Sequence, residues 1–308
     1  MTDLRSISVP ERLSGRRVDV VAAELLPDVS RSRLHGLLAQ GYVRVDGVAV
    51  KPSKKVAMGQ SLEVELPETE PLRAVPEDIP LDIVYRDRDL AIIDKPAGLV
   101  VHPAAGHPTG TLANALAALF PGARDVGSEV RPGVVHRLDK DTSGLMVVAL
   151  NAAALGSLQK QIAERTADRR YLALAAGRVE PAEGTIEAPI GRDVRDRKRM
   201  SVHGIGARPA RTSYRVLEYL PGFTLLEARL HTGRTHQIRV HLSALGHPIA
   251  GDSTYGGPPL LGLNRQFLHS YRLALTSPSN GERLQFESPL PQDLATALGR
   301  IRAGEGEP

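Results

Sequence analysis

Apolar positions in the first part of the chain repeat with two different periods. Over residues 18–26 they recur at helical spacing, which predicts a helix. Ser30 can cap a second helix that follows it, because its hydroxyl can accept a hydrogen bond from the first turn. Alternating apolar positions then predict strands on both sides of a turn at Asp46, and again over residues 61–66. We therefore expect a small α/β domain over residues 10–67.

A stretch rich in Pro and acidic residues follows this domain. Residues 68–80 show no apolar periodicity, which predicts an extended linker. Periodic patterns resume after it and continue almost to the end of the chain. We expect a second, larger domain over residues 81–300 and a flexible tail over residues 301–308.

Strands outnumber helices in the predicted second domain. The helices fall between the strands at irregular intervals, rather than one after each strand. This pattern favours an α+β fold in which helices flank a mixed, largely antiparallel sheet. A late helix is predicted after Thr235, with Ile238, Leu242 and Leu245 as its apolar face. The other predicted elements are strands over residues 83–85, 90–93, 170–179, 212–220 and 224–231, and helices over residues 111–119 and 152–164.

Three clusters of polar residues lie far apart in the sequence, each beside a predicted strand or helix end. The first lies between the apolar runs Val134–Val135 and Leu145–Leu150, which we expect to be two buried strands. The second is Arg169–Tyr171, and the third is His231–His241, with three His and two Arg in eleven residues. Polar loops on a rigid scaffold are where binding and catalysis concentrate.

The composition narrows the classes of protein that these clusters can serve. The chain has 308 residues, 39 Lys or Arg against 35 Asp or Glu, a formal net charge of +4, and no Cys. The absence of Cys excludes disulfides, thiolate metal sites and a Cys nucleophile. There is no apolar signal segment and no apolar run long enough to cross a bilayer, so we expect a cytoplasmic protein without a membrane partner. The many Arg residues favour a phosphate-bearing partner such as RNA or DNA.

The third cluster could hold a metal ion, but the spacing of its His residues does not favour one. His236 and His241 are five residues apart and His231 lies outside the predicted helix, whereas a zincin helix carries two His on one face. The sequence also lacks a Gly-x-Ser-x-Gly nucleophile elbow, a phosphate-binding loop and a dinucleotide-binding fingerprint. A carboxylate is then the natural candidate for a reacting group.

A reacting carboxylate needs a cation beside it to stay ionised in a partly dry cleft. Either Asp139 or Asp141 in the first cluster, paired with Arg239 in the third, meets this requirement. The residue pattern alone leaves the choice between the two carboxylates open.

The first domain resembles the S-four-like RNA-binding module, which is named after a ribosomal protein. The resemblance rests on a helix, the segments Ser-Arg-Ser-Arg-Leu and Gly-Tyr-Val-Arg-Val-Asp-Gly, and a closing strand, in that order. In that family the second helix and the adjoining basic residues lie on RNA; the alternative is that these charges are ordinary solvated groups. The phosphate contacts that the resemblance implies are Arg31, Arg33, Arg44, Lys54 and Lys55.

The first polar cluster, His-Arg-Leu-Asp-Lys-Asp-Thr-Ser-Gly-Leu, closely resembles the signature of the RluA/RluD-type pseudouridine synthases. The resemblance implies that Asp139 is the family's essential Asp, that Arg239 forms a salt bridge with it, and that Tyr171 stacks on the target base. Arg137 would fill the space left by the flipped nucleotide, and His136 would lie beside the chemistry without a fixed role. Further stretches that carry the resemblance are residues 90–103, 199–202, 210–216, 233–241 and 247–256.

The resemblance implies an enzyme that isomerises uridine to pseudouridine in structured RNA. The reaction breaks the bond from ribose to a base nitrogen, turns the base and joins the ribose to carbon 5, so we expect no cofactor and no metal. A carboxylate can attack the anomeric carbon or remove the proton from carbon 2′, and the sequence does not distinguish these routes. We expect the target to be a stem-loop of large-subunit ribosomal RNA in a pre-ribosomal particle, bound by a monomer, with no DNA partner.

A basic run over residues 192–199 suggests one more RNA contact. Five of its eight residues are basic and two are acidic, without a core pattern, which is typical of an RNA-gripping arm or of a solvated turn. The candidate contacts are Arg197, Lys198 and Arg199.

Three alternative functions stay open: a tRNA pseudouridine synthase, a ribosome-assembly protein that binds RNA without catalysis, and a metallohydrolase built on the His-rich cluster.

Overall fold

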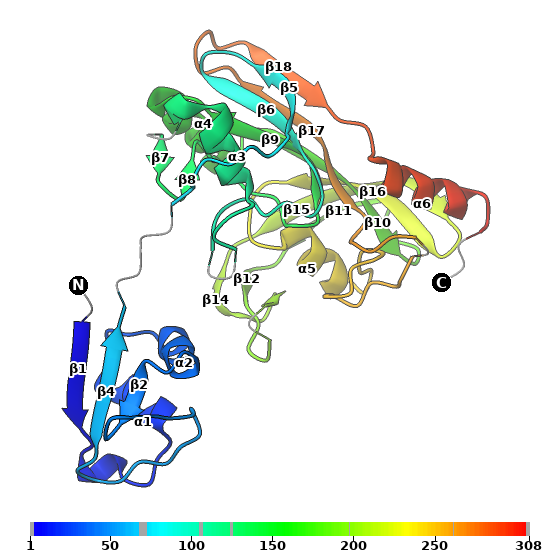
Figure 1. The fold of residues 1–308 in the computed structure, drawn as a ribbon. Coiled ribbons are helices and arrows are strands. Elements are labelled where there is room, and N and C mark those ends of the chain that lie inside the picture. The colour runs from blue at the N-terminus through cyan, green and yellow to red at the C-terminus, as the bar shows by residue number, and fades with distance from the viewer. Residues whose placement is uncertain are drawn as a thin grey trace. The chain divides into compact units, whose positions relative to one another are not determined.

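The chain forms two compact units, Met1–Pro71 and Leu72–Pro308 (Figure 1). Residues 68–72 of the predicted linker lie outside the described part of the chain, as does Arg197 of the predicted arm. The computed structural model describes residues 3–67, 73–104, 107–123, 126–196, 198–260 and 262–305.

The first unit is a four-stranded antiparallel sheet packed against two helices. The Ser30 cap is confirmed, since its hydroxyl accepts a hydrogen bond from the Arg33 amide at 3.3 Å. The apolar faces of both helices and the inner face of the sheet share one core, which includes Val21, Leu34 and Leu62. In chain order the elements are β1 (Asp3–Ser8), η1 (Glu11–Leu13), α1 (Val18–Leu25), α2 (Arg31–Ala39), β2 (Val43–Val45), β3 (Val48–Ala49) and β4 (Ser61–Leu66).

Strand β1 corrects the predicted start of this unit at residue 10. It pairs with β4 over its whole length, from Asp3 opposite Leu66 to Ser8 opposite Ser61. No side chain of β1 is buried, because it is an edge strand with one open face. An edge strand of this kind shows little apolar alternation, so the sequence pattern does not reveal it.

The second unit is built on a nine-stranded sheet, and the predicted α+β fold with a mixed, largely antiparallel sheet is confirmed (Figure 1). Neighbouring strands pair antiparallel except β9 and β17, which are parallel. In spatial order the strands are β11 (Glu183–Glu187), β15 (Arg211–Leu220), β16 (Phe223–Leu230), β10 (Asp168–Ala176), β17 (Leu268–Thr276), β9 (Ser143–Ala149), β6 (Leu90–Lys95) and β5 (Asp82–Arg86), with β18 (Arg283–Glu287) also beside β17.

Helices and short strands cover and border this sheet. The helices are α3 (Leu112–Leu119), α4 (Ala152–Ala163), α5 (Gln237–Ala244) and α6 (Gln292–Arg302), with a 3₁₀ turn η2 (Pro121–Ala123). The short strands are β7 (Gly127–Ser128), β8 (Arg131–Pro132), β12 (Ile190–Arg192), β13 (Met200–Ser201) and β14 (Ile205–Arg208). Within the described ranges, none of the helices has the length and apolarity needed to cross a membrane.

Strand β9 is the element that positions the first polar cluster. All seven of its residues are buried, because Leu145 and Val147 pack into one apolar cluster with α4 while Met146 and Val148 pack into another with α3. It lies between β6 and β17, and its first residues follow directly on the polar turn. The turn is therefore attached to the middle of the sheet, where the backbone is well held.

The run before the turn is not a strand, which corrects the prediction for Val134–Val135. Of the two residues only Val134 pairs, in a single bridge with Val148. Gly133 has φ +64 and passes so close to β9 that an added Cβ would lie 2.2 Å from the Ala149 carbonyl oxygen. The chain therefore lies against the last residues of β9 with one bridge and does not form a paired strand.

Two helix ends also differ from the predictions. The residue before α5 is His236, with φ 56, and Thr235 does not cap the helix. Ile238 and Leu242 are buried as predicted, but Leu245 follows the last helical residue and is 44 % exposed. Helix α6 continues through Arg302 and buries Ile301, so the ordered helix extends past the predicted start of the tail at residue 301; residues 306–308 lie outside the described part.

We predict that Gly144→Ala lowers the free energy of unfolding of the second unit by about 3 kcal/mol or more, because Gly144 has φ +113 and an added Cβ would lie 2.3 Å from the Ser270 carbonyl oxygen. Urea denaturation followed by circular dichroism measures this change.

The matched control is Gly156→Ala in α4, where an added Cβ meets nothing within 4 Å. This exposed helical position should gain up to about 1 kcal/mol from the better helix former. Equal effects of the two substitutions would contradict the close approach of β9 and β17.

Candidate active site

Two buried cationic side chains, Lys95 and Arg265, donate hydrogen bonds to backbone carbonyls of the turn that carries Asp139. Lys95 is fully buried and its ammonium donates to the Lys140 carbonyl at 3.0 Å, and to the carbonyls of Pro96 and Leu99 at 2.7 and 2.9 Å. Burial lowers the pKa of Lys95 to about 8. Arg265 donates to the Asp141 carbonyl at 3.1 Å.

Arg239 of α5 links two carboxylates. Its Nη1 lies 3.2 Å from Asp139 Oδ2, and its Nε and Nη2 donate to the two carboxylate oxygens of Asp252 at 2.7 and 2.8 Å. Burial alone would lower the pKa of Arg239, but the hydrogen bonds and charges of Asp252 and Asp139 outweigh it and raise that pKa above its ordinary value. The guanidinium is therefore a fixed positive charge beside Asp139.

Asp252 keeps Arg239 in this position. Its carboxylate is 1 % exposed and also accepts the backbone N–H groups of Thr254 and Tyr255 at 3.2 and 3.3 Å. The ring of Tyr255 lies under the Arg239 guanidinium, with 5.0 Å between the guanidinium carbon and the ring centroid.

His236 approaches Asp139 from the other side. Its Nε2 lies 3.9 Å from Asp139 Oδ1, and its Nδ1 lies 2.8 Å from the Tyr255 hydroxyl. That hydroxyl also accepts a hydrogen bond from the Met200 amide, so Tyr255 connects His236 to the segment at Met200. Burial lowers the pKa of His236 below its ordinary value, which favours the neutral ring.

The structure brings Asp139, Tyr171 and Arg239 together around one small hollow of 40 Å³. Tyr171 comes from β10 and is only 3 % exposed. The hollow has room for a few water molecules. His236 also lines it.

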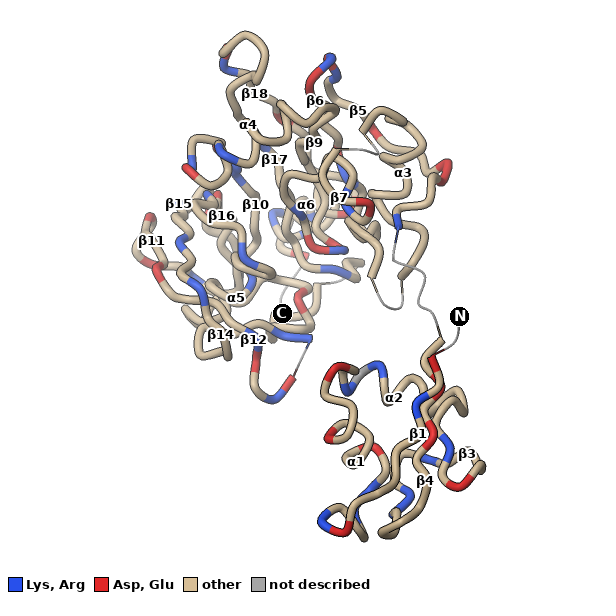
Figure 2. Tube along the Cα trace, turned by 90° about the vertical axis from the view of Figure 1, so that its left-hand side faces the viewer, with Lys and Arg blue, Asp and Glu red and all other residues tan. Residues whose placement is uncertain are grey.

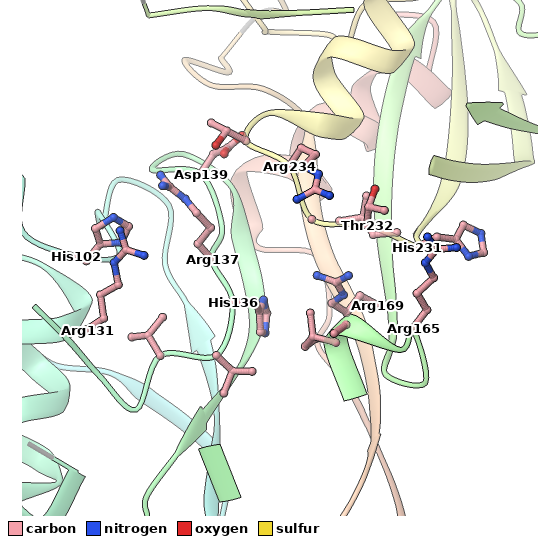
Figure 3. Close-up of a pocket in the computed structure, with 17 residues that line it drawn as sticks. His102, Arg131, His136, Arg137, Asp139, Arg165, Arg169, His231, Thr232 and Arg234 are labelled. Carbon is pink, nitrogen blue, oxygen red and sulfur yellow. The ribbon is translucent and has the colours of Figure 1, made fainter. Parts of the chain in front are cut away.

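A larger cavity of 420 Å³ adjoins the hollow and shares Asp139 and Arg137 with it (Figure 3). Arg137 is exposed at this border. His136 lines the larger cavity, where its Nε2 accepts from the Val147 amide at 3.2 Å, and burial lowers its pKa to about 3. His136 is therefore neutral at physiological pH.

Of the predicted contacts in the basic run, Lys198 and Arg199 line neither cavity. Lys198 is exposed, whereas Arg199 is half-buried with its guanidinium 5.3 Å from the Tyr255 ring centroid. Arg33 donates to the Pro67 carbonyl at 2.9 Å. The five predicted contacts of the first unit are all exposed: Arg31, Arg33, Arg44, Lys54 and Lys55. Figure 2 marks the Lys and Arg positions along the chain in blue.

The His residues of the third cluster are hydrogen-bonded to separate partners. His231 Nε2 lies 2.8 Å from the Ser213 hydroxyl, and His241 Nδ1 lies 2.9 Å from the Thr212 hydroxyl. Across the described ranges, no three His, Asp or Glu side chains are grouped so that they could hold a metal ion.

Sequence reasoning gave no role to Asp252 and Tyr255, and it considered His236 only as a candidate metal ligand. Asp252 and Tyr255 lie in the stretch 247–256, which contributed to the resemblance without any assigned function. Their part in the site depends on tertiary contacts with α5, which a one-dimensional pattern does not contain.

Comparison with known proteins identifies the class. Residues 89–244 match the RNA pseudouridylate synthase family, and residues 16–62 match the S4 domain. The chain is 48 % identical over 305 residues to ribosomal large subunit pseudouridine synthase D of Nitrosomonas europaea, which covers 96 % of this chain and 87 % of that protein. It is 43 % identical to the uncharacterized RNA pseudouridine synthase YlyB of Bacillus subtilis, with 96 % and 97 % covered.

A solved structure agrees with these sequence matches. Human RNA pseudouridylate synthase domain containing 1 superposes with a TM-score of 0.54 at 31 % identity, over 78 % of this chain and 100 % of that one. The chain therefore belongs to the RNA pseudouridylate synthase family, with an S4 domain at its N-terminal end. It is an isomerase, and the predicted family is confirmed.

We predict that Asp252→Asn lowers the free energy of unfolding by about 3 kcal/mol, because it removes the bidentate charge partner of a buried guanidinium. Chemical denaturation monitored by tyrosine fluorescence measures the change.

Glu218→Gln is the matched control, since it breaks the surface ion pair of Glu218 with Arg302 and should cost at most about 1 kcal/mol. A similar cost for both variants would show that Asp252 does not hold Arg239 as described.

Proposed function

We propose that this pseudouridine synthase acts on large-subunit ribosomal RNA and that Asp139 is its reacting carboxylate. The observation that carries the proposal is the contact between Asp139 and the buried Arg239, at the border of the hollow that Tyr171 lines. The guanidinium gives this carboxylate a charged hydrogen-bond partner and a fixed position.

Each step of the isomerisation has a candidate group. Asp139 either attacks the anomeric carbon of the ribose or takes the proton from carbon 2′, and in both cases the bond from ribose to the base nitrogen breaks. The free base turns and its carbon 5 bonds to the anomeric carbon; in the first route this displaces the Asp139 oxygen, and in the second route Asp139 returns the proton to carbon 2′. The proton on carbon 5 then leaves, and the base nitrogen that was bonded to the ribose takes up a proton. Arg239 holds Asp139 through these steps, and His236 Nε2 lies 3.9 Å from the other oxygen of the same carboxylate.

The target base must leave its stack before it can react, which costs a few kcal/mol. We assign Tyr171 to stacking on the base, because its ring lines the hollow next to Asp139. Arg137 is exposed there and lines both cavities, which suits it to take the place of the flipped nucleotide in the RNA.

The proposed RNA target rests on the first unit and on the relatives. An S4 domain with exposed basic residues suits a structured RNA partner, and a relative that shares 48 % of its sequence bears the name of a large-subunit enzyme. We propose that the RNA contacts include Arg31, Arg44 and Lys54, and that a monomer acts on a pre-ribosomal particle in the cytoplasm.

Release of tritium from carbon 5 of labelled uridine in large-subunit ribosomal RNA tests this proposal. Asp139→Asn should lower the release rate by at least about 10³-fold, because it removes the reacting group, while RNA affinity changes little. Filter binding measures the affinity.

The control variant is Asp78→Asn, which changes an exposed carboxylate outside the site and should keep the wild-type rate. Normal release by Asp139→Asn would reassign the reacting group. Release from tRNA but not from ribosomal RNA would overturn the proposed target.

A further inference from the structure

The 420 Å³ cavity beside Asp139 is lined by five arginines and has an excess of positive charge. Asp139 is the single carboxylate among its lining residues, and Arg239 already binds it. None of the lining arginines forms an ion pair with a carboxylate of the described chain. They are Arg131, Arg137, Arg165, Arg169 and Arg234.

Among these arginines, Arg169 is the one whose burial lowers the stability of the fold. Its side chain is 4 % exposed, its Nε is buried without a hydrogen-bond partner, and no described carboxylate lies within 4 Å of its guanidinium. The next residue of the same strand, Arg170, pairs with Asp168 and Glu227. A buried guanidinium without a counter-charge is destabilising, so its presence requires another explanation.

The surroundings of Arg169 direct it into the cavity. Its Nη1 lies 3.1 Å from the place where a Cβ on Gly233 would be, so the absence of a side chain at Gly233 makes room for it. Figure 3 shows the guanidinium groups of Arg169 and Arg234 pointing toward one another across the cavity. Two like charges directed at the same space form a binding site for an anion between them.

The chemistry of this site fits a phosphate group of a nucleic acid chain. Guanidinium groups bind phosphate oxygens in pairs of parallel hydrogen bonds. A volume of 420 Å³ is in the range that holds a nucleotide-sized ligand, which is roughly 300–1,000 Å³. The cavity also shares Asp139 and Arg137 with the hollow proposed for the target base, so one RNA strand can occupy both.

We propose that this cavity binds one backbone phosphate of the RNA, next to the nucleotide whose base enters the Asp139 hollow, with Arg169 as the buried anchor. The placement next to the target nucleotide rests on the proposed function, whereas the phosphate site itself does not.

Arg169→Met tests the anchor in the full-length protein, because it removes the charge and keeps an unbranched side chain of similar length. Binding of oligouridylate over a range of salt concentrations should show a slope of log K against log [salt] that is shallower by about 0.7, the value for one phosphate contact of a single strand. At low salt the affinity should fall about tenfold. The melting temperature should rise, since an uncompensated buried charge is gone.

Arg300→Met is the matched control, since it removes an exposed arginine of α6 outside the cavity. It should leave the salt slope unchanged. An unchanged slope together with a lower melting temperature for Arg169→Met would overturn the proposal and show a structural role for Arg169. A shallower slope for Arg169→Met, together with no tritium release from ribosomal RNA by the wild-type protein, would support the phosphate site and refute the proposed function.

The position of the phosphate can be tested with neutral methylphosphonate linkages placed one at a time around a mapped target uridine. One linkage adjacent to the uridine should weaken binding to the wild-type protein about tenfold and leave binding to Arg169→Met unchanged. Equal losses in both proteins at every linkage would contradict the assignment.

Discussion

The structure of the site depends on one buried guanidinium. Arg239 is fixed by two hydrogen bonds to Asp252 and uses its remaining nitrogen to hold Asp139, so a residue of the helix and a residue of the central turn meet at a defined distance. A buried ion pair of this kind gains little stability over apolar packing, but removing one partner is costly. The arrangement therefore favours a defined geometry at Asp139 more than it favours overall stability.

The sheet supplies the other half of this geometry. Strand β9 is buried on both faces, and the turn before it is held by Lys95 and Arg265 through backbone carbonyls. Asp139 thus projects from a turn that cannot easily shift, toward a helix whose first residue follows the left-handed His236. His236 has a left-handed backbone conformation and Arg169 is a buried charge without a partner. Backbone strain and unpaired charge of this kind are typical of sites that bind or react.

Much of the fold could be predicted from sequence because its elements have regular apolar periods. The exceptions have physical causes: β1 is an open edge strand, Val134–Val135 makes only one bridge to β9, and α5 begins without a side-chain cap. The pairing of Asp139 with Arg239 was one of two choices that charge reasoning left open, and the family resemblance selected it. Asp252, Tyr255 and Arg169 were missed or left without a role, since burial and the absence of a partner exist only in three dimensions.

The most direct measurement is a map of pseudouridines in large-subunit ribosomal RNA from cells with and without this protein. We predict that deletion removes pseudouridine at specific positions, and that the wild-type gene restores them while a gene encoding Asp139→Asn does not. Persistence of every pseudouridine in the deletion strain, or restoration by the Asp139→Asn gene, would contradict the account.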